Sequence, residues 1–230
     1  MIVHAYGGLS NRLRVIFSHL ATHGPIGVVW VPDGEIAGAR FEDVFMPLAG
    51  VTFYYHATGA SYRTCDPAPG APAGWEESYR KLHLRPEYRD KLNAICPPEP
   101  YSAIHVRRTD HRDYAPACTD ATQDEEFLRF IDDEAHQDVY IATDNGTTQR
   151  EFRRYVERTC RKPHTNSLMH IHERQDVGGQ RNSTLADSAI DLFICAGADD
   201  FMGSRHSSFT NLIHTLRGLE MTYRSMHADP

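Results

Sequence analysis

Two adjacent arginines, Arg107 and Arg108, follow the apolar segment 101–106, and Asp110 and Asp113 come soon after them. A guanidinium group is a planar fork that keeps its charge and binds phosphate through two hydrogen bonds. A carboxylate within hydrogen-bond reach can take the proton from an attacking hydroxyl. Because consecutive strand residues point to opposite faces, we expect one arginine to face a ligand and the other to brace a helix or loop. A simpler interpretation, surface arginines paired with Asp110, stays open.

Three other positions suit a phosphorylated nucleotide. Gly7 and Gly8 turn an apolar strand into a helix, where main-chain N–H groups can approach an anion, although a tight turn alone also explains them. Ser207 and Ser208 precede a helix and can either cap it or hold a phosphate. Asp191 stands in an otherwise apolar run, so it needs hydrogen-bond partners. It either caps a neighbouring loop or accepts from the N1–H and the amine of guanine.

Hydrophobic periodicity predicts alternating strands and helices along the chain. The expected strands are 2–6, 26–31, 51–57, 101–106, 138–143, 167–172 and 199–204. The expected helices are one within 7–24 and those at 124–136, 148–160, 184–198 and 208–221, with helical turns in 40–48 and 76–95. Ser10 is a candidate N-cap of the first helix and Gly24 its stop. The segment 59–75 is rich in Gly, Ala and Pro and predicts an irregular loop.

This alternation over short connections predicts an α/β fold, with parallel sheets flanked by helices. Pro97, Pro98 and Pro100 indicate a hinge between two α/β lobes, 1–96 and 97–230. Ligands of such sheets bind at the carboxyl ends of the strands. The glycine, arginine and serine motifs all fall at such ends, so we expect a functional cleft between the lobes.

The bulk composition excludes several classes of protein. The formal net charge of the 230 residues is −7, so a broad basic face for nucleic acid is not expected. The five cysteines are odd in number and form no CxxC pair, which favours a reducing compartment over a disulfide framework. The chain opens on a strand pattern rather than a signal peptide, and no apolar run reaches transmembrane length. We therefore expect a cytoplasmic protein that is a monomer or a weak homo-oligomer.

Four motifs resemble the fucosyltransferase superfamily, most nearly the α1,6- and nodulation fucosyltransferases. "HVRRTD" (105–110) is similar to the HxRRxD signature, and "GGLSNR" (7–12) to the glycine loop of the α1,2 enzymes and the protein O-fucosyltransferases. "VYIATDN" (139–145) resembles a stretch of the α1,6 group, and 183–209 resembles its last motif, in which an aspartate on a helix precedes a Ser-Ser pair. The resemblance implies a GT-B-like fold of two facing Rossmann-like lobes, the N-terminal one on the acceptor side and the C-terminal one binding the nucleotide sugar. It also implies GDP-fucose as donor, inversion at the anomeric carbon and no metal.

The matching positions carry roles over from this resemblance. It places Arg107 on the diphosphate, with Arg108 as its structural neighbour, and it places His105 and Asp191 on guanine. The other implied donor contacts are Ser207, Ser208 and the main chain of Phe209 on the phosphates, and Gly7, Gly8 and Asn11 from the N-terminal lobe.

The chain departs from the family at the general base. A glutamate proposed for this role in the α1,6 group falls near Ala115 and is missing. We expect Asp113 to take the proton of the acceptor hydroxyl, with His111 as the alternative, because its ordinary pKa suits the task. Asp110 is expected to orient Arg107.

These residues predict an inverting transferase that moves L-fucose from GDP-fucose to a glycan hydroxyl without a metal or other cofactor. Its short chain resembles a reduced microbial or viral enzyme. Its partners would be a GDP-sugar donor and a glycan acceptor. Three alternatives stay open: another GDP-sugar such as GDP-mannose, a non-catalytic nucleotide- or carbohydrate-binding module, and a metal-dependent hydrolase that uses histidines such as His170 and His172.

Overall fold

A computed structural model describes residues 1–32, 38–56, 62–108, 122–133, 138–158 and 183–221 of the chain. The chain divides into two compact units. The first comprises Met1–Arg89 and Thr184–Ala189, and the second comprises Asp90–Ser183 and Ile190–Pro230. The division after Arg89 falls inside α3 (Pro86–Ile95), before the prolines that indicated a division after residue 96. The roles expected of the two lobes stay predictions.

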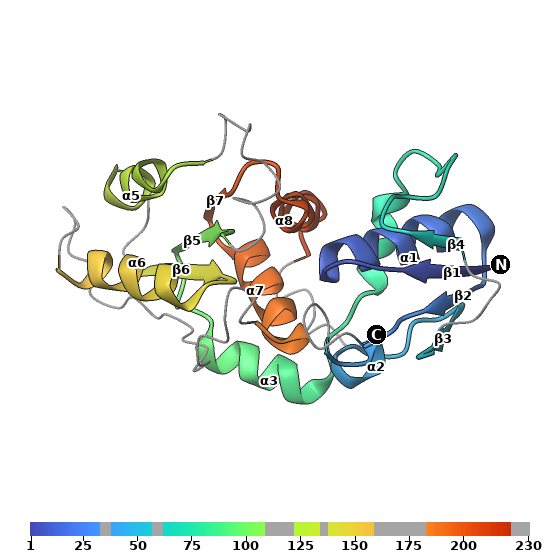
Figure 1. Cartoon of the computed structure of the whole chain (residues 1–230). Coiled ribbons are helices and arrows are strands. Elements are labelled where there is room, and N and C mark those ends of the chain that lie inside the picture. The colour runs from blue at the N-terminus through green and yellow to red at the C-terminus, as the bar shows by residue number, and fades with distance from the viewer. Residues whose placement is uncertain (33–37, 57–61, 109–121, 134–137, 159–182, 222–230) are drawn as a thin grey trace. The chain divides into compact units, whose positions relative to one another are not determined.

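The first unit contains a four-stranded parallel sheet in the order β3-β2-β1-β4 (Figure 1). Its strands are β1 (Ile2–Ala5), β2 (Ile26–Val29), β3 (Val51–Tyr54) and β4 (Tyr62–Thr64). The first three were predicted, but β4 lies in the segment predicted to be an irregular loop, and there the prediction was wrong. β4 is a three-residue edge strand beside β1. Its pairing with β1 forms the strand, and Tyr62 and Thr64 are residue types that favour one.

Helix α1 (Leu9–His23) packs against β1 and β2 and begins earlier than predicted. Its N-cap is Gly8, whose backbone is extended (φ −69°, ψ 173°). Ser10 was predicted to be the cap, but it lies inside the first turn, where it is buried. The predicted stop at Gly24 is confirmed, and its φ of 71° explains why glycine ends this helix.

Shorter helices complete the first unit, as the patterns in 40–48 and 76–95 predicted. They are α2 (Phe41–Val44), the 3₁₀ helix η1 (Trp75–Lys81) and the start of α3. Aromatic rings fill the space beside β3, where Phe41 stacks on Phe53 with a centroid distance of 4.4 Å. Trp30 packs edge-on against the same two rings and is fully buried.

The second unit contains a three-stranded parallel sheet in the order β6-β5-β7. Its strands, all predicted, are β5 (Tyr101–Val106), β6 (Asp138–Thr143) and β7 (Asp200–Gly203). Every residue of β5 and β6 is buried, which is typical of parallel strands covered on both faces. The strand predicted at 167–172 lies outside the described residues.

Helices cover both faces of this second sheet. On one face, α5 (Asp124–Asp133) and α6 (Gly146–Arg158) enclose a hydrophobic cluster with alternate residues of β5 and β6. This cluster includes Ile104, Val106, Val139, Ile141, Phe127 and Phe152. The other face meets α7 (Leu185–Gly197) and α8 (Ser208–Gly218), and there Tyr101 Oη donates a hydrogen bond of 2.7 Å to the Ile194 carbonyl.

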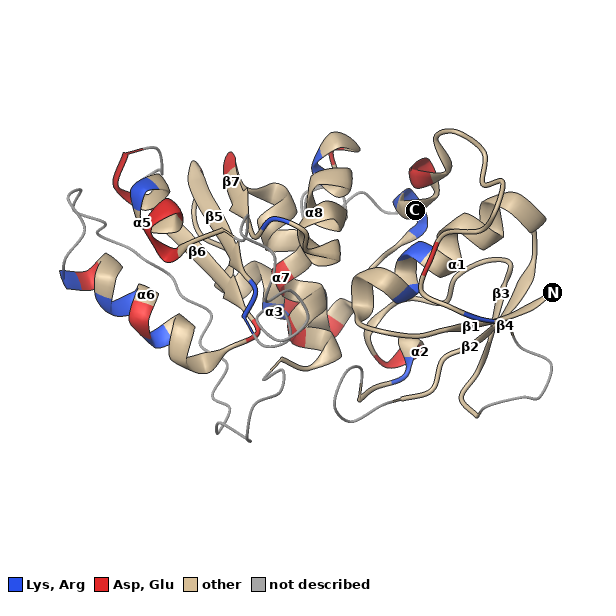
Figure 2. Cartoon of the chain, turned by 45° about the horizontal axis from the view of Figure 1, so that its top comes forward, with Lys and Arg blue, Asp and Glu red and all other residues tan. Residues whose placement is uncertain are grey.

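Charged side chains lie on the helices of the second unit and not on its central strand. Figure 2 shows both signs of charge along α5 and α6, whereas β5 carries none. This is the distribution of helices with one face in solvent. Within the described residues, no helix combines the length and the apolar composition needed to span a membrane.

Candidate functional site

At the carboxyl edge of the second sheet, hydrogen bonds join the end of β5 to the residue that follows β7. The main-chain N–H of Arg107 donates to Ser204 Oγ at 2.9 Å, and the N–H of Ser204 donates to the His105 carbonyl at 2.9 Å. Ser204 is buried, so these bonds are shielded from water. Arg107 therefore leaves the sheet from a fixed main-chain position, with its side chain partly exposed.

Arg108 makes its contacts at the same edge but on the side of β5 where β6 lies. Its main-chain N–H donates to Asp144 Oδ1 at 3.1 Å, just after β6. Its guanidinium forms an ion pair with Asp124, the first residue of α5, and the side chain is 16% exposed. The structure thus gives Arg108 a bracing contact. Continued strand alternation predicts that the Arg107 side chain lies on the other face, the one that meets α7 and α8.

Two helices begin at this edge with their N-termini capped. Ser207 is the N-cap of α8, and its Oγ accepts a hydrogen bond from the Thr210 N–H at 3.4 Å. Asn145 Oδ1 accepts from the Thr148 N–H at 2.9 Å in the first turn of α6. The remaining N–H groups of a first turn and the helix dipole both favour an anion. Of the two roles left open for Ser207, the structure shows the cap.

His105 is enclosed between β5 and the start of α8. Its side chain is 6% exposed, its Nδ1 lies 2.9 Å from Thr210 Oγ1, and its ring packs on Phe209 with a centroid distance of 4.8 Å. Burial lowers the pKa of His105 to about 4, and the positive charge of Arg107 acts in the same direction, against Asp144 and Asp191. The imidazole is therefore neutral near pH 7.

This buried histidine predicts a pH-dependent loss of stability. The folded-state pKa of about 4 lies below the ordinary value of 6.5, so the unfolded chain takes up the proton first as the pH falls. The contribution of His105 to the free energy of unfolding is complete above about pH 6.5, declines below that pH and levels off near pH 4. Between pH 7 and pH 5, urea denaturation should show wild type losing about 2 kcal/mol more than His105→Gln. If both proteins lost the same free energy of unfolding, the conclusion that His105 is buried as a neutral imidazole would be wrong.

Asp191 is a buried carboxylate with a buried partner. It lies on α7, is 5% exposed, and its Oδ1 accepts a hydrogen bond of 2.6 Å from the Tyr140 hydroxyl on β6. Burial, and then the charge of Asp191, raise the pKa of Tyr140 well above its ordinary value, so the hydroxyl stays a donor. The sequence analysis missed Tyr140. The signal was available, because a tyrosine inside an apolar strand needs a partner for its hydroxyl.

The glycine turn of the first unit is held by side chains of α1. Gly7 has a φ of 87°, and a Cβ at this position would lie 3.0 Å from the Asn11 amide nitrogen. Asn11 Oδ1 in turn accepts from Arg14 Nη2 at 3.0 Å. These contacts place Asn11 directly beside the turn.

Arg12 is a second residue that the sequence analysis missed. It is 3% exposed, and its Nε donates to the Gly7 carbonyl at 2.8 Å. Its Nη1 donates to the Val31 carbonyl at 2.9 Å, and its guanidinium lies 4.8 Å from the centroid of the Trp30 ring. The buried cation therefore joins the ends of β1 and β2. Its position three residues after Leu9, on the apolar face of α1, was a signal of burial in the sequence.

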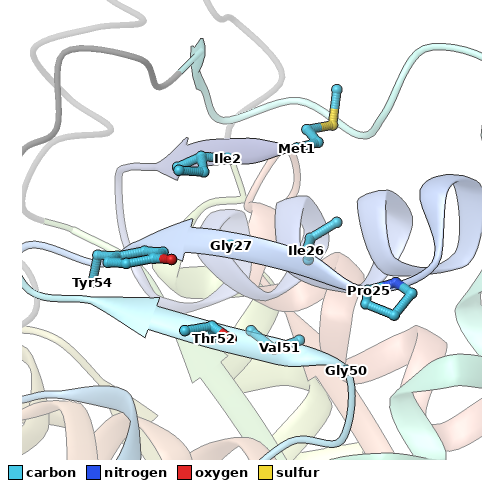
Figure 3. Close-up of a pocket in the computed structure, with 9 residues that line it drawn as sticks. All are labelled: Met1, Ile2, Pro25, Ile26, Gly27, Gly50, Val51, Thr52 and Tyr54. Atoms are coloured by element: carbon cyan, nitrogen blue, oxygen red, sulfur yellow. The ribbon is translucent and has the colours of Figure 1, made fainter.

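The first unit also has a hollow of about 430 Å³ on its sheet, beside residues such as Ile2, Gly27, Val51 and Tyr54 (Figure 3). The side chain of Tyr54 lies over β2 at Gly27, where a Cβ would come within 2.9 Å of its ring. Of the described residues that line this hollow, none has a charged side chain. The described lining therefore offers no arginine or lysine side chain to a diphosphate.

Several predicted residues lie outside the described part of the chain. They are Asp110, His111 and Asp113, the candidates for orienting Arg107 and for the base, and the histidine pair His170 and His172. Within the described residues, no three His, Cys, Asp or Glu side chains are grouped so that they could hold a metal ion. The identity of the base and the independence from metal stay predictions.

Comparison with known proteins places the fold. No family model and no curated protein matches the sequence. NodZ α-1,6-fucosyltransferase soaked with GDP-fucose is 15% identical, with a TM-score of 0.57 over 94% of this chain and 91% of that chain. POFUT1 in complex with GDP is 12% identical, with a TM-score of 0.57 over 94% and 95% of the two chains. Fucosyltransferase NodZ from Bradyrhizobium is 14% identical, with a TM-score of 0.57 over 92% and 90%. The chain has the α/β, GT-B-type fold of these fucosyltransferases, as its motifs predicted.

Proposed function

We propose that this protein is a metal-independent glycosyltransferase that moves L-fucose from GDP-fucose to a glycan hydroxyl, with inversion. One observation carries the proposal. Arg107 extends from the carboxyl edge of the second sheet, where Ser204 fixes its main chain and the capped N-terminus of α8 begins. This edge of an α/β sheet is where nucleotide ligands bind, and the chain shares its fold with structures that contain GDP or GDP-fucose.

The proposed reaction needs positive charge at the leaving group. The bond between the anomeric carbon and the β-phosphate oxygen breaks, the acceptor oxygen bonds to that carbon, and GDP departs with increased negative charge. Arg107 and the first-turn N–H groups of α8 stabilise that charge in the transition state, which is the role Mg²⁺ has in other transferases. Asp113 or His111 takes the proton of the acceptor hydroxyl.

We assign the guanine to Asp191 and His105. A carboxylate can accept both the N1–H and the amine of guanine, and the hydrogen bond from Tyr140 fixes the orientation of Asp191. The proposed phosphate contacts here are Ser207, Ser208 and the main-chain N–H of Phe209. The Ser207 hydroxyl accepts a hydrogen bond as the N-cap of α8 and can still donate its own proton to a phosphate. Gly7, Gly8 and Asn11 are further proposed contacts of the diphosphate.

The experiment that tests this function measures release of nucleoside diphosphate from GDP-fucose, GDP-mannose and ADP-glucose, with and without EDTA. GDP-fucose should be cleaved fastest, EDTA should leave the rate unchanged, and a screened glycan acceptor should accelerate the release. Loss of activity in EDTA would instead support a metal-dependent enzyme. Binding of GDP without any turnover would support a non-catalytic module.

A further inference from the structure

Thr210 is held in one position in the first turn of α8, facing His105. It is buried, and its Oγ1 lies 2.9 Å from His105 Nδ1. Gly203, the last residue of β7, makes room for it, because a Cβ there would meet Thr210 Cγ2 and would lie 2.7 Å from Oγ1. A β-branched side chain has few rotamers in a helix. The backbone of β7 and α8 therefore fixes the direction of the Thr210 hydroxyl.

The hydrogen bond between Thr210 and His105 has a direction that the surroundings determine. A buried hydroxyl proton needs an acceptor. Among the residues that the structure describes, the hydroxyl of Thr210 has no hydrogen-bond partner other than His105 Nδ1. The hydroxyl therefore donates and Nδ1 accepts. A neutral imidazole whose Nδ1 accepts carries its proton on Nε2.

We propose that Thr210 is a positioning residue that holds His105 as the Nε2–H tautomer, so that His105 offers a hydrogen-bond donor to guanine. This inference rests on the proposed function. Guanine presents O6 and N7 as acceptors, whereas adenine has an amine, a donor, in place of O6. An N–H group directed at the O6 position therefore attracts guanine and repels adenine, whereas N7 is an acceptor in both bases. The pair of Thr210 and His105 thus contributes to the choice of nucleotide separately from Asp191.

The first test determines the tautomer of His105 in the absence of any ligand. Two-bond ¹H–¹⁵N NMR distinguishes Nδ1–H from Nε2–H imidazoles, and the signal that His105→Gln lacks identifies His105 among the 14 histidines. Wild type and Thr210→Ser should show the Nε2–H pattern. Thr210→Val, which has the same shape but no hydroxyl, should show a mixture of tautomers. An Nδ1–H pattern in the wild type would overturn the proposal.

The second test measures affinity for GDP, inosine diphosphate and ADP by calorimetry. Inosine diphosphate keeps O6 but lacks the amine expected to contact Asp191. Thr210→Val should weaken the binding of GDP and of inosine diphosphate alike, by about threefold to tenfold, and should not weaken the binding of ADP. Thr210→Ser should restore wild-type values for all three. Equal affinities in wild type and Thr210→Val would overturn the positioning role.

The two tests separate this inference from the proposed function. If His105 is the Nε2–H tautomer but the protein binds neither GDP nor inosine diphosphate, the assignment of the proton is supported. The proposal that this tautomer recognises guanine is then wrong. GDP binding by a protein with the Nδ1–H tautomer would support the proposed function and overturn the role of Thr210.

Discussion

In the Arg107→Ala variant, we expect GDP-fucose cleavage to slow by about 10²- to 10³-fold, because a donor aimed at the leaving diphosphate is lost. Stability should change little, by less than about 1 kcal/mol, because Arg107 is partly exposed and its main-chain bond to Ser204 does not need the side chain. Initial rates at saturating donor, together with urea denaturation, separate the two effects. Arg107→Lys should recover part of the rate, since it keeps the charge but loses the bidentate geometry.

Arg108→Ala is the matched control, because the two arginines are adjacent but differ in their contacts. The loss of the ion pair with Asp124 should lower the free energy of unfolding by about 1–2 kcal/mol. Its effect on the rate should be smaller than that of Arg107→Ala. Wild-type rates in both variants would mean that the diphosphate binds elsewhere. The reverse order of rates would exchange the roles of the two arginines.

For Arg12→Ala, we expect the free energy of unfolding to fall by about 3 kcal/mol. Two charge-assisted hydrogen bonds are lost, and the carbonyls of Gly7 and Val31 are left without this donor. The stack on Trp30 is lost as well. Urea denaturation followed by circular dichroism measures the change.

Arg80→Ala is the control for this effect. Arg80 is an exposed arginine paired with Glu77, with side chains 53% and 63% exposed. Its removal should change the free energy of unfolding by no more than about 0.5 kcal/mol. If Arg12→Ala were equally mild, the glycine turn would not depend on the buried guanidinium.

The second sheet was predictable because its strands carry a strong local signal. Segments 101–106 and 138–143 are short, apolar and bounded by polar turns, and both form the expected parallel strands. The alternation of side chains also predicted that one arginine would brace a helix, and the ion pair between Arg108 and Asp124 is such a contact. These inferences needed only neighbouring residues.

The features that were missed depend on contacts between residues far apart in the sequence. β4 exists because it pairs with β1, and Arg12 is buried because the end of β2 brings Val31 to it. The partners Tyr140 and Asp191 are 51 residues apart, and His105 and Thr210 are 105 residues apart. Each sequence position alone showed a polar group that needed a partner. Only the packed sheet and helices show which partner it has.

We expect a guanine nucleotide to bind at the carboxyl edge of the second sheet, with Arg107 on its diphosphate. Calorimetric titration of wild type and Arg107→Ala with GDP and ADP tests this binding site. Wild type should bind GDP at least about tenfold more tightly than ADP, because Asp191 and His105 read the base. The Arg107→Ala variant should bind GDP about 10- to 100-fold more weakly, which is the effect of losing one charged hydrogen bond. No binding of GDP, equal affinity for ADP, or an unchanged affinity in Arg107→Ala would mean that this edge is not the guanine nucleotide site.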